Sequence, residues 1–270
     1  MKISEHVLLK KNVNVKRLLL TIFLVLVVWI IGLGIWVQDQ YVVPIMMYHR
    51  VSLADESPAN TVSPKVFARQ MSFLKRNGYQ VIPFEELVEG INAGKKFSHK
   101  TVVITFDDGY KDNYKNAFPV LKKYHFPATI FLISDTIGVS PNLLTWDQIK
   151  EMGQYGITFG SHTRRHVYLP EESEEELEDE IFGSKRVIEE HLGKPVYYFS
   201  YPSGGFSEHI KFLTAMAGYK AAVTTNRGNR YNIDLYELNR IHINNGDFWL
   251  VLWNKLSGYY NLFRKLKSSH

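Results

Sequence analysis

Two polar clusters, each placed directly after an apolar run, hold residues whose types and spacing suit hydrolysis. Asp107 and Asp108 form an adjacent carboxylate pair, and His162 and His166 lie four residues apart. Two imidazoles at that spacing can reach one metal ion from a single turn. Two histidine nitrogens and one aspartate oxygen would make a metal site with open positions for water and substrate. The second aspartate, left uncoordinated, would then act as a general base for that water.

A third cluster, YPSGG at 201–205, follows another apolar run. Its glycines allow the backbone to approach a ligand closely, and a free N–H there would bind an oxyanion. Each cluster also has a plain structural interpretation. Asp-Gly is a common turn dipeptide, an isolated HxxxH pair is more often two surface histidines, and the aromatic residues 197–199 suit core packing. The occurrence of both charged clusters just past expected strands favours the functional interpretation.

The elements that must position these clusters alternate between short apolar strands and helices. We expect seven strands, at 44–48, 102–106, 128–133, 157–160, 197–201, 221–225 and 240–243. We expect helices at 64–77, 113–125, 145–155, 173–193 and 207–218, four of them capped by Ser63, Thr145, Ser173 and Ser207. Such alternation predicts an α/β domain with parallel strands, either a doubly wound sheet or a closed barrel. In both, chemistry gathers at the C-terminal ends of the strands.

Composition and charge exclude several classes of site. The 270 residues contain no cysteine, which excludes disulfides, thiol nucleophiles and cysteine-ligated metals. The formal net charge of +5 belongs to the ends, because residues 1–37 and 255–270 each carry +4 and residues 38–254 carry −3. The main domain therefore has no electrostatic basis for binding nucleic acid. The acidic run 171–180 begins a helix, where negative charge is favourable, and we expect it to be solvated.

The N-terminal region reads as a membrane segment. Residues 18–37 are uncharged, long enough to span about 30 Å as a helix, and preceded by four basic residues. A cleaved signal peptide is the alternative, but the run is long and no A-x-A pattern follows it. We therefore expect a single-pass cell-membrane protein with a cytoplasmic basic tail at 1–17 and an anchor at 18–37. An extracytoplasmic catalytic domain would occupy 38–254, followed by a basic tail at 255–270.

The blocks TFDDG, SHTRRH and YPSGG, in this order, resemble the polysaccharide deacetylase family with the NodB homology domain (carbohydrate esterase family 4). The resemblance covers about residues 42–250, and the run 43–51 is similar to the opening strand of the poly-N-acetylglucosamine deacetylase subgroup. It implies a distorted (β/α)7 barrel. It also implies a monomer that hydrolyses N-acetyl groups on an N-acetylglucosamine polymer of the cell wall or an exopolysaccharide. The implied cofactor is a divalent metal, Zn²⁺ first, with Co²⁺, Ni²⁺ or Mn²⁺ as alternatives.

The resemblance also implies roles for single residues. Asp107 matches the family's catalytic base, and Asp108, His162 and His166 match its metal ligands. Tyr201 matches the residue whose backbone N–H helps to form the oxyanion hole. The expected substrate-binding residues are Trp146, Asp147, Pro202 and Gly204, of which Asp147 also suits a helix N-terminus.

Two departures from the common family pattern leave roles to fill. The third block lacks the arginine that orients the base, and Arg240 is the candidate replacement. No clear leucine–histidine motif supplies the general acid, so His49 is the favoured candidate and His242 the competitor. Residues 240 and 242 of one strand would point to the same side. A catalytically silent carbohydrate-binding relative and an O-acetyl esterase or other amidase of the same fold are the alternative functions.

Overall fold

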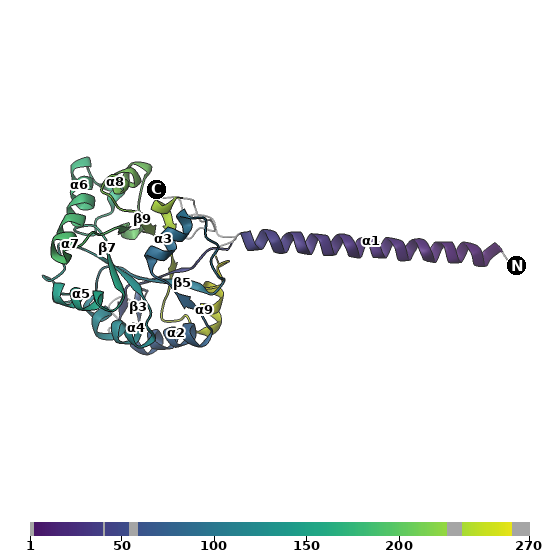
Figure 1. Ribbon diagram of the computed structural model, residues 1–270, viewed down its shortest axis with the longest axis horizontal. Helices are drawn as coiled ribbons and strands as arrows, with labels where there is room; N and C mark the ends of the chain where they lie inside the picture. Colours follow the sequence, from purple (N-terminus) through teal and green to yellow (C-terminus); the bar gives the residue numbers. More distant parts are fainter. Residues whose placement is uncertain (1–2, 40, 54–58, 226–233, 261–270) are drawn as a thin grey trace. The chain divides into compact units, whose positions relative to one another are not determined.

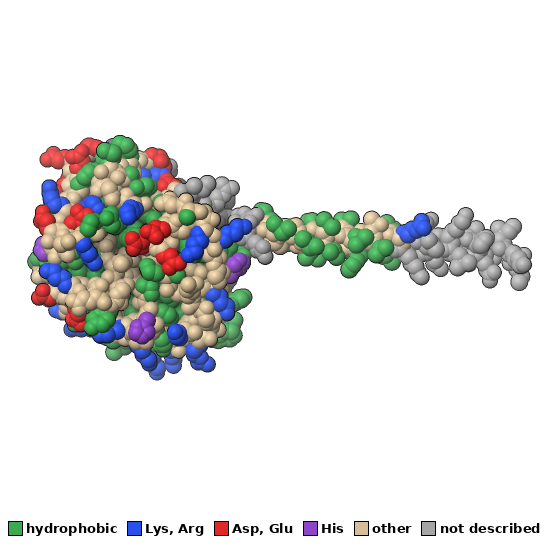
Figure 2. Space-filling model, viewed as in Figure 1, with side chains coloured by type: hydrophobic (Ala, Val, Ile, Leu, Met, Phe, Trp, Pro, Cys, Tyr) green, Lys and Arg blue, Asp and Glu red, His purple; other side chains and the backbone are tan. Residues whose placement is uncertain are grey.

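The computed structural model describes residues 3–39, 41–53, 59–225 and 234–260, which form two compact units, Met1–Tyr41 and Val42–His270. The first unit is a single helix, α1 (Ile3–Asp39). Its segment Arg17–Trp36 has a mean hydropathy of 3.0 and is long and apolar enough to cross a membrane, as the N-terminal pattern predicted. Hydrophobic side chains cover this stretch of the helix on the face drawn in Figure 2. A signal sequence near the N-terminus can also pass this test of length and hydropathy.

The second unit is built on one parallel sheet surrounded by helices (Figure 1). The strands run in the order β10-β9-β8-β7-β6-β5-β1-β11, and β4 pairs with β5. The nine strands are β1 (Ile45–Tyr48), β4 (Gln80–Val81), β5 (Thr101–Phe106), β6 (Ala128–Leu132), β7 (Ile157–Ser161), β8 (Tyr198–Ser200), β9 (Ala221–Thr224), β10 (Leu238–Asn239) and β11 (Ile241–His242). A separate pair consists of β2 (Arg50–Val51) and β3 (Thr61–Val62).

The sheet closes on itself through one residue. Its two outermost strands in the pairing order, β10 and β11, are consecutive in sequence and separated only by Arg240. The segment expected as one strand at 240–243 is thus the seam of a barrel. The prediction of a NodB-type (β/α) barrel is confirmed, and the doubly wound alternative is wrong.

The strands are apolar because both of their faces are covered. All six residues of β5, TVVITF, are buried, as are all five of β6. A parallel sheet with side chains inside the barrel and helices outside requires such continuous apolar runs. The polar residues that follow each run therefore emerge together at one end of the barrel.

The outer helices match most of the predicted ones. They are α2 (Pro64–Arg76), α3 (Phe84–Asn92), α4 (Phe118–Tyr124), α5 (Trp146–Gly153), α6 (Glu174–Glu178), α7 (Ser184–Leu192), α8 (Glu208–Met216) and α9 (Trp249–Lys255). All four predicted cap residues accept a hydrogen bond from a backbone N–H of their helix. The expected helices at 113–125 and 173–193 each contain a π-helical turn, η1 (Asn113–Ala117) and η3 (Asp179–Gly183). Short 3₁₀ turns are η2 (Leu169–Glu171), η4 (Pro202–Gly204) and η5 (Leu235–Glu237).

The barrel domain extends beyond residue 254. Lys255 is buried in the last turn of α9, where its Nζ lies 2.6 Å from Asp247 Oδ2 and donates to the carbonyl of His242. Leu256 is fully buried. The boundary expected between a domain ending at 254 and a tail beginning at 255 is therefore wrong, because these two residues complete the core. Residues 261–270 of that tail lie outside the described residues.

Candidate active site

Asp108, His162 and His166 converge at the C-terminal ends of β5 and β7. Each offers one ligand atom, and the three atoms lie within 4.8 Å of one another. Both histidine Nε2 atoms are 3.5 Å from Asp108 Oδ1. Two ligands bound to one tetrahedral ion at about 2.1 Å would be about 3.4 Å apart, so this spacing suits a divalent metal.

The backbone of these ligands is held in an unusual conformation. Asp108 and His166 have φ values of 71° and 63°, and Thr163, between the histidines, has 66°. Residues other than glycine rarely adopt this left-handed backbone conformation, and they keep it only where the surrounding structure imposes it. Thr163 helps to impose it, because its Oγ1 accepts a hydrogen bond from the N–H of His166. The two histidines are thereby turned toward a common point.

The chemistry of the three groups also fits a metal. His162 Nδ1 lies 2.7 Å from the carbonyl oxygen of Ser200. A carbonyl only accepts, so Nδ1 carries the proton and Nε2 is left to coordinate. Burial lowers the pKa of His162 to about 3, which keeps the imidazole neutral. Burial and then the charge of Asp107 raise the pKa of Asp108 to about 7, and its Oδ1 has no hydrogen-bond partner among the described residues. A bound cation would offset the cost of burying the charged Asp108 carboxylate and would give its Oδ1 a partner.

Asp107 is anchored by Arg240 from the barrel seam. The guanidinium donates from Nη1 to Oδ1 at 2.7 Å and from Nη2 to Oδ2 at 2.6 Å, and both side chains are buried. Burial opposes ionisation of Asp107, but the charge of Arg240 outweighs it and holds the pKa of this carboxyl well below its usual range. Asp107 is therefore an oriented carboxylate next to the triad of Asp108, His162 and His166.

A buried glutamate that sequence reasoning missed shapes the histidine loop. Glu180, in the π-helical turn η3, accepts hydrogen bonds from the N–H groups of Arg164 and Arg165 and pairs with the Arg165 side chain. It is fully buried, so the expectation that the whole run 171–180 is solvated is wrong at this residue. Glu180 lies three residues after the buried Leu177 and four before the buried Ser184, so the helical period places it on the inner face. That spacing was the signal in the sequence that could have placed Glu180 on the inner face.

The two candidate general acids lie together. The rings of His49 and His242 have centroids 5.9 Å apart. The side chain of Asn113, in the other π-helical turn, donates to the carbonyl of His49 at 2.8 Å. Burial lowers the pKa of His49 to about 4, although the charge of Asp107 acts in the opposite direction. His49 is therefore a neutral imidazole at neutral pH.

The structure contradicts the oxyanion role expected of Tyr201. Its N–H donates to the carbonyl of Val223 at 3.1 Å and so belongs to the sheet. The following turn is held by two hydrogen bonds, Gly204 N–H to Tyr201 O and Gly205 N–H to Pro202 O. These bonds do not involve the N–H of Ser203, a residue with a positive φ of 54°. The glycine pair had indicated a free N–H in this block, and it is the turn rather than the strand end that offers one.

The other expected substrate-binding residues have different surroundings. Gly204, with φ +75°, packs so closely on β9 that an added Cβ would lie 2.2 Å from Thr225 Oγ1. Pro202 is buried beside it. At the start of α5, the Trp146 ring stacks on His191 with centroids 4.0 Å apart, and Asp147 is exposed. A glycan-binding role for these four residues stays a prediction.

Comparison with known proteins identifies the family. A family model described as polysaccharide deacetylase matches residues 94–222, a range that contains Asp107, the metal-ligand triad and the 201–205 turn. YxkH of Bacillus subtilis, classed by its name with the polysaccharide deacetylases, is 38% identical over 204 residues, which are 75% of this chain and 72% of that protein. The poly-β-1,6-N-acetyl-D-glucosamine N-deacetylase of Staphylococcus epidermidis is 34% identical over 145 residues, 52% of this chain and 49% of the enzyme.

A solved structure agrees with both sequence matches. The Streptococcus pyogenes deacetylase PplD, determined in complex with acetate, superposes with a TM-score of 0.73 at 32% sequence identity. The superposition covers 80% of this chain and 99% of PplD. The chain therefore belongs to the polysaccharide deacetylase family.

Proposed function

We propose that this protein is a membrane-anchored, metal-dependent enzyme that removes N-acetyl groups from a glycan outside the cytoplasm. As a member of its family it is a polysaccharide N-deacetylase, a hydrolase of linear amides that acts on N-acetylglucosamine-type polymers. The observation that carries the proposal is the Asp107–Arg240 ion pair next to the triad of Asp108, His162 and His166. It supplies an oriented base beside a metal site.

In this proposal Asp108, His162 and His166 hold a divalent metal, with Zn²⁺ favoured by the mixed nitrogen and oxygen donors. When bound, such an ion lowers the pKa of water and polarises the acetamide carbonyl. Asp107 removes the proton from the attacking water, and Arg240 fixes the direction of its oxygens. A positioned base of this kind contributes about 10²–10⁴-fold to the rate.

The remaining steps concern the oxyanion and the leaving amine. The N–H of Ser203 replaces that of Tyr201 as our candidate donor to the oxyanion. His49 is our candidate proton donor to the amine. Because the pKa of His49 is about 4, it must gain its proton during turnover. The proton that Asp107 takes from water is the available source, and Asp107 acts on His49 electrostatically. Acetate and a free amine on the sugar result.

The anchorage rests on α1. Its uncharged residues 18–36 follow Lys10, Lys11, Lys16 and Arg17, an arrangement that retains the N-terminus in the cytoplasm. A tethered enzyme would reach glycan close to the membrane, such as wall polymer or an exopolysaccharide leaving the cell.

The test is acetate release by the full chain in detergent from N-acetylglucosamine oligomers, peptidoglycan and O-acetylated xylan. We expect release from the N-acetylated substrates, loss on chelation and recovery with Zn²⁺. Asp108→Asn should lose metal and activity, whereas Asp107→Asn should keep metal and lose turnover. Glu178→Gln, an exposed carboxylate change, is the control and should keep both.

Three outcomes would contradict the proposal. If both aspartate variants bind metal normally and hydrolyse the oligomer, the site is wrong. Release from xylan alone would make the protein an O-acetyl esterase. Bound metal without turnover on any substrate would make it the silent carbohydrate-binding relative.

A further inference from the structure

Helix α9 presents a row of large apolar side chains to the outside. Phe248, Trp249, Leu250 and Trp253, which we call the α9 surface, are 64%, 63%, 50% and 58% exposed. Exposed apolar patches of this kind mark sites that meet a partner or a membrane. The residues around the α9 surface indicate which of the two it contacts.

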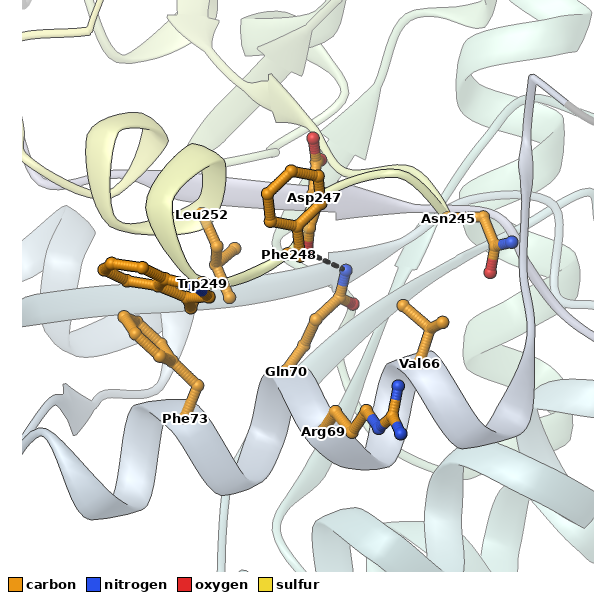
Figure 3. A pocket seen from close by; sticks show the side chains of 9 residues that line it. All are labelled: Val66, Arg69, Gln70, Phe73, Asn245, Asp247, Phe248, Trp249 and Leu252. Atoms are coloured by element: carbon orange, nitrogen blue, oxygen red, sulfur yellow. Dashed lines mark hydrogen bonds between the residues drawn. The ribbon is translucent and has the colours of Figure 1, made fainter.

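The α9 surface continues into a pocket of about 350 Å³ between α9 and α2 (Figure 3). Phe248 and Trp249 line it from α9, and Phe73 lines it from α2. Arg69 borders the same pocket, and a second hollow beside Trp249 is lined by Arg69 and Arg76. Both arginines are exposed. Aromatic and aliphatic groups flanked by arginines match the chemistry of a phospholipid interface, with acyl chains below phosphate headgroups.

The segment that follows α9 pairs with the start of the barrel domain. Helix α9 follows β11 and leads to Gly258, whose carbonyl accepts a hydrogen bond from the N–H of Val42 at 3.1 Å. Val42 begins the barrel domain, and α1 ends at Asp39. Three residue steps span at most about 10 Å of extended chain. If α1 crosses a membrane, this short connection limits how far Val42 and Gly258 can lie from the end of α1.

We propose that the α9 surface inserts into the interfacial layer of the membrane that α1 spans, with Arg69 and Arg76 on the phospholipid phosphates. The inference rests on the proposed anchorage. Tryptophan and phenylalanine are favoured at that depth, and an anionic leaflet would add attraction for the arginines. Since α9 runs back from the C-terminal end of β11, this second contact would hold the catalytic end of the barrel at a set height.

The test uses the full chain in liposomes of phosphatidylcholine and phosphatidylglycerol. The sequence has no cysteine, so single substitutions can carry one nitroxide label each. Leu250→Cys reports on the α9 surface, and Met216→Cys, at a 63% exposed apolar residue of α8, is the matched control. Ile30→Cys reports whether α1 is inserted. We expect the labels at 250 and 30 to gain collisions with oxygen dissolved in lipid and to lose collisions with an aqueous nickel chelate, and the label at 216 to remain in water.

The other outcomes separate this inference from the anchorage. If the label at 30 lies in lipid and the label at 250 is as accessible to water as the label at 216, the inference is refuted and the anchorage stands. A label at 30 in water refutes the anchorage and the inference together. If the label at 250 is shielded from both reagents, another part of the chain covers the surface. If an N-acetylglucosamine oligomer shields it and lipid does not, the surface binds glycan. Both results overturn the inference.

Discussion

Replacing Arg240 by methionine tests whether the barrel seam stabilises the catalytic base. Arg240 is fully buried and donates five hydrogen bonds, two to Asp107 and one each to Thr105, Ser200 and the carbonyl of Thr224. In Arg240→Met the carboxylate of Asp107 would stay buried without its partner. Breaking a buried pair in this way costs about 3–5 kcal/mol of unfolding free energy. Denaturant unfolding of the full chain in detergent micelles measures it.

A double variant separates lost charge pairing from lost packing. Arg240→Met with Asp107→Asn buries no charge at this position, so it should recover about 2 kcal/mol relative to Arg240→Met alone. Neither variant should turn over substrate, because the base is misoriented in one and absent in the other. A double variant no more stable than Arg240→Met would refute the reasoning, since the loss would then be a packing effect.

The same pair predicts a pH dependence with a definite sign. In the native protein the pKa of Asp107 is depressed, so its stabilising contribution is present above about pH 4 and is lost only as the pH falls through the lowered value. In Arg240→Met, burial without the guanidinium should raise the pKa of Asp107 instead. The stability deficit of this variant should therefore shrink between pH 7 and pH 5. A deficit that is constant over this range would contradict the assignment.

Two further substitutions test the loops around the site. Glu180→Gln should weaken metal binding by about 10–100-fold, because the histidine loop loses a charged acceptor, while Glu178→Gln, two residues away and exposed, should not. Metal titration of the two variants measures the difference, and equal affinities would exclude a positioning role for Glu180. Gly204→Ala should lower the unfolding free energy by more than Gly94→Ala. Both glycines have positive φ, but of the two only Gly204 would place the new Cβ within 4 Å of other atoms. Denaturant unfolding measures the two losses of unfolding free energy. Equal losses would show that the contact with Thr225 is relieved easily.

The candidate metal ligands could be picked out from sequence because each lies in a short local motif. The two histidines share one turn, and the aspartate pair directly follows a continuous apolar run, so strand ends and spacing were enough to suggest a common site. The buried strands were equally visible, since a strand covered on both faces must be apolar throughout. Helices α3 and α9 were not predicted, although α3 buries Phe84, Leu87 and Val88 at helical spacing.

The partners of the site were decided by tertiary structure. Arg240 lies 133 residues from Asp107, and only closure of the barrel brings its guanidinium onto that carboxylate. Glu180 reaches the histidine loop only because its helical segment packs against that loop, and the N–H of Tyr201 is occupied by the carbonyl of Val223 in β9. A sequence pattern predicts one helix or strand and the polar residues at its end. The packing of separate elements decides which distant side chain or N–H contacts those residues, because most hydrogen bonds and buried contacts of such groups form between elements.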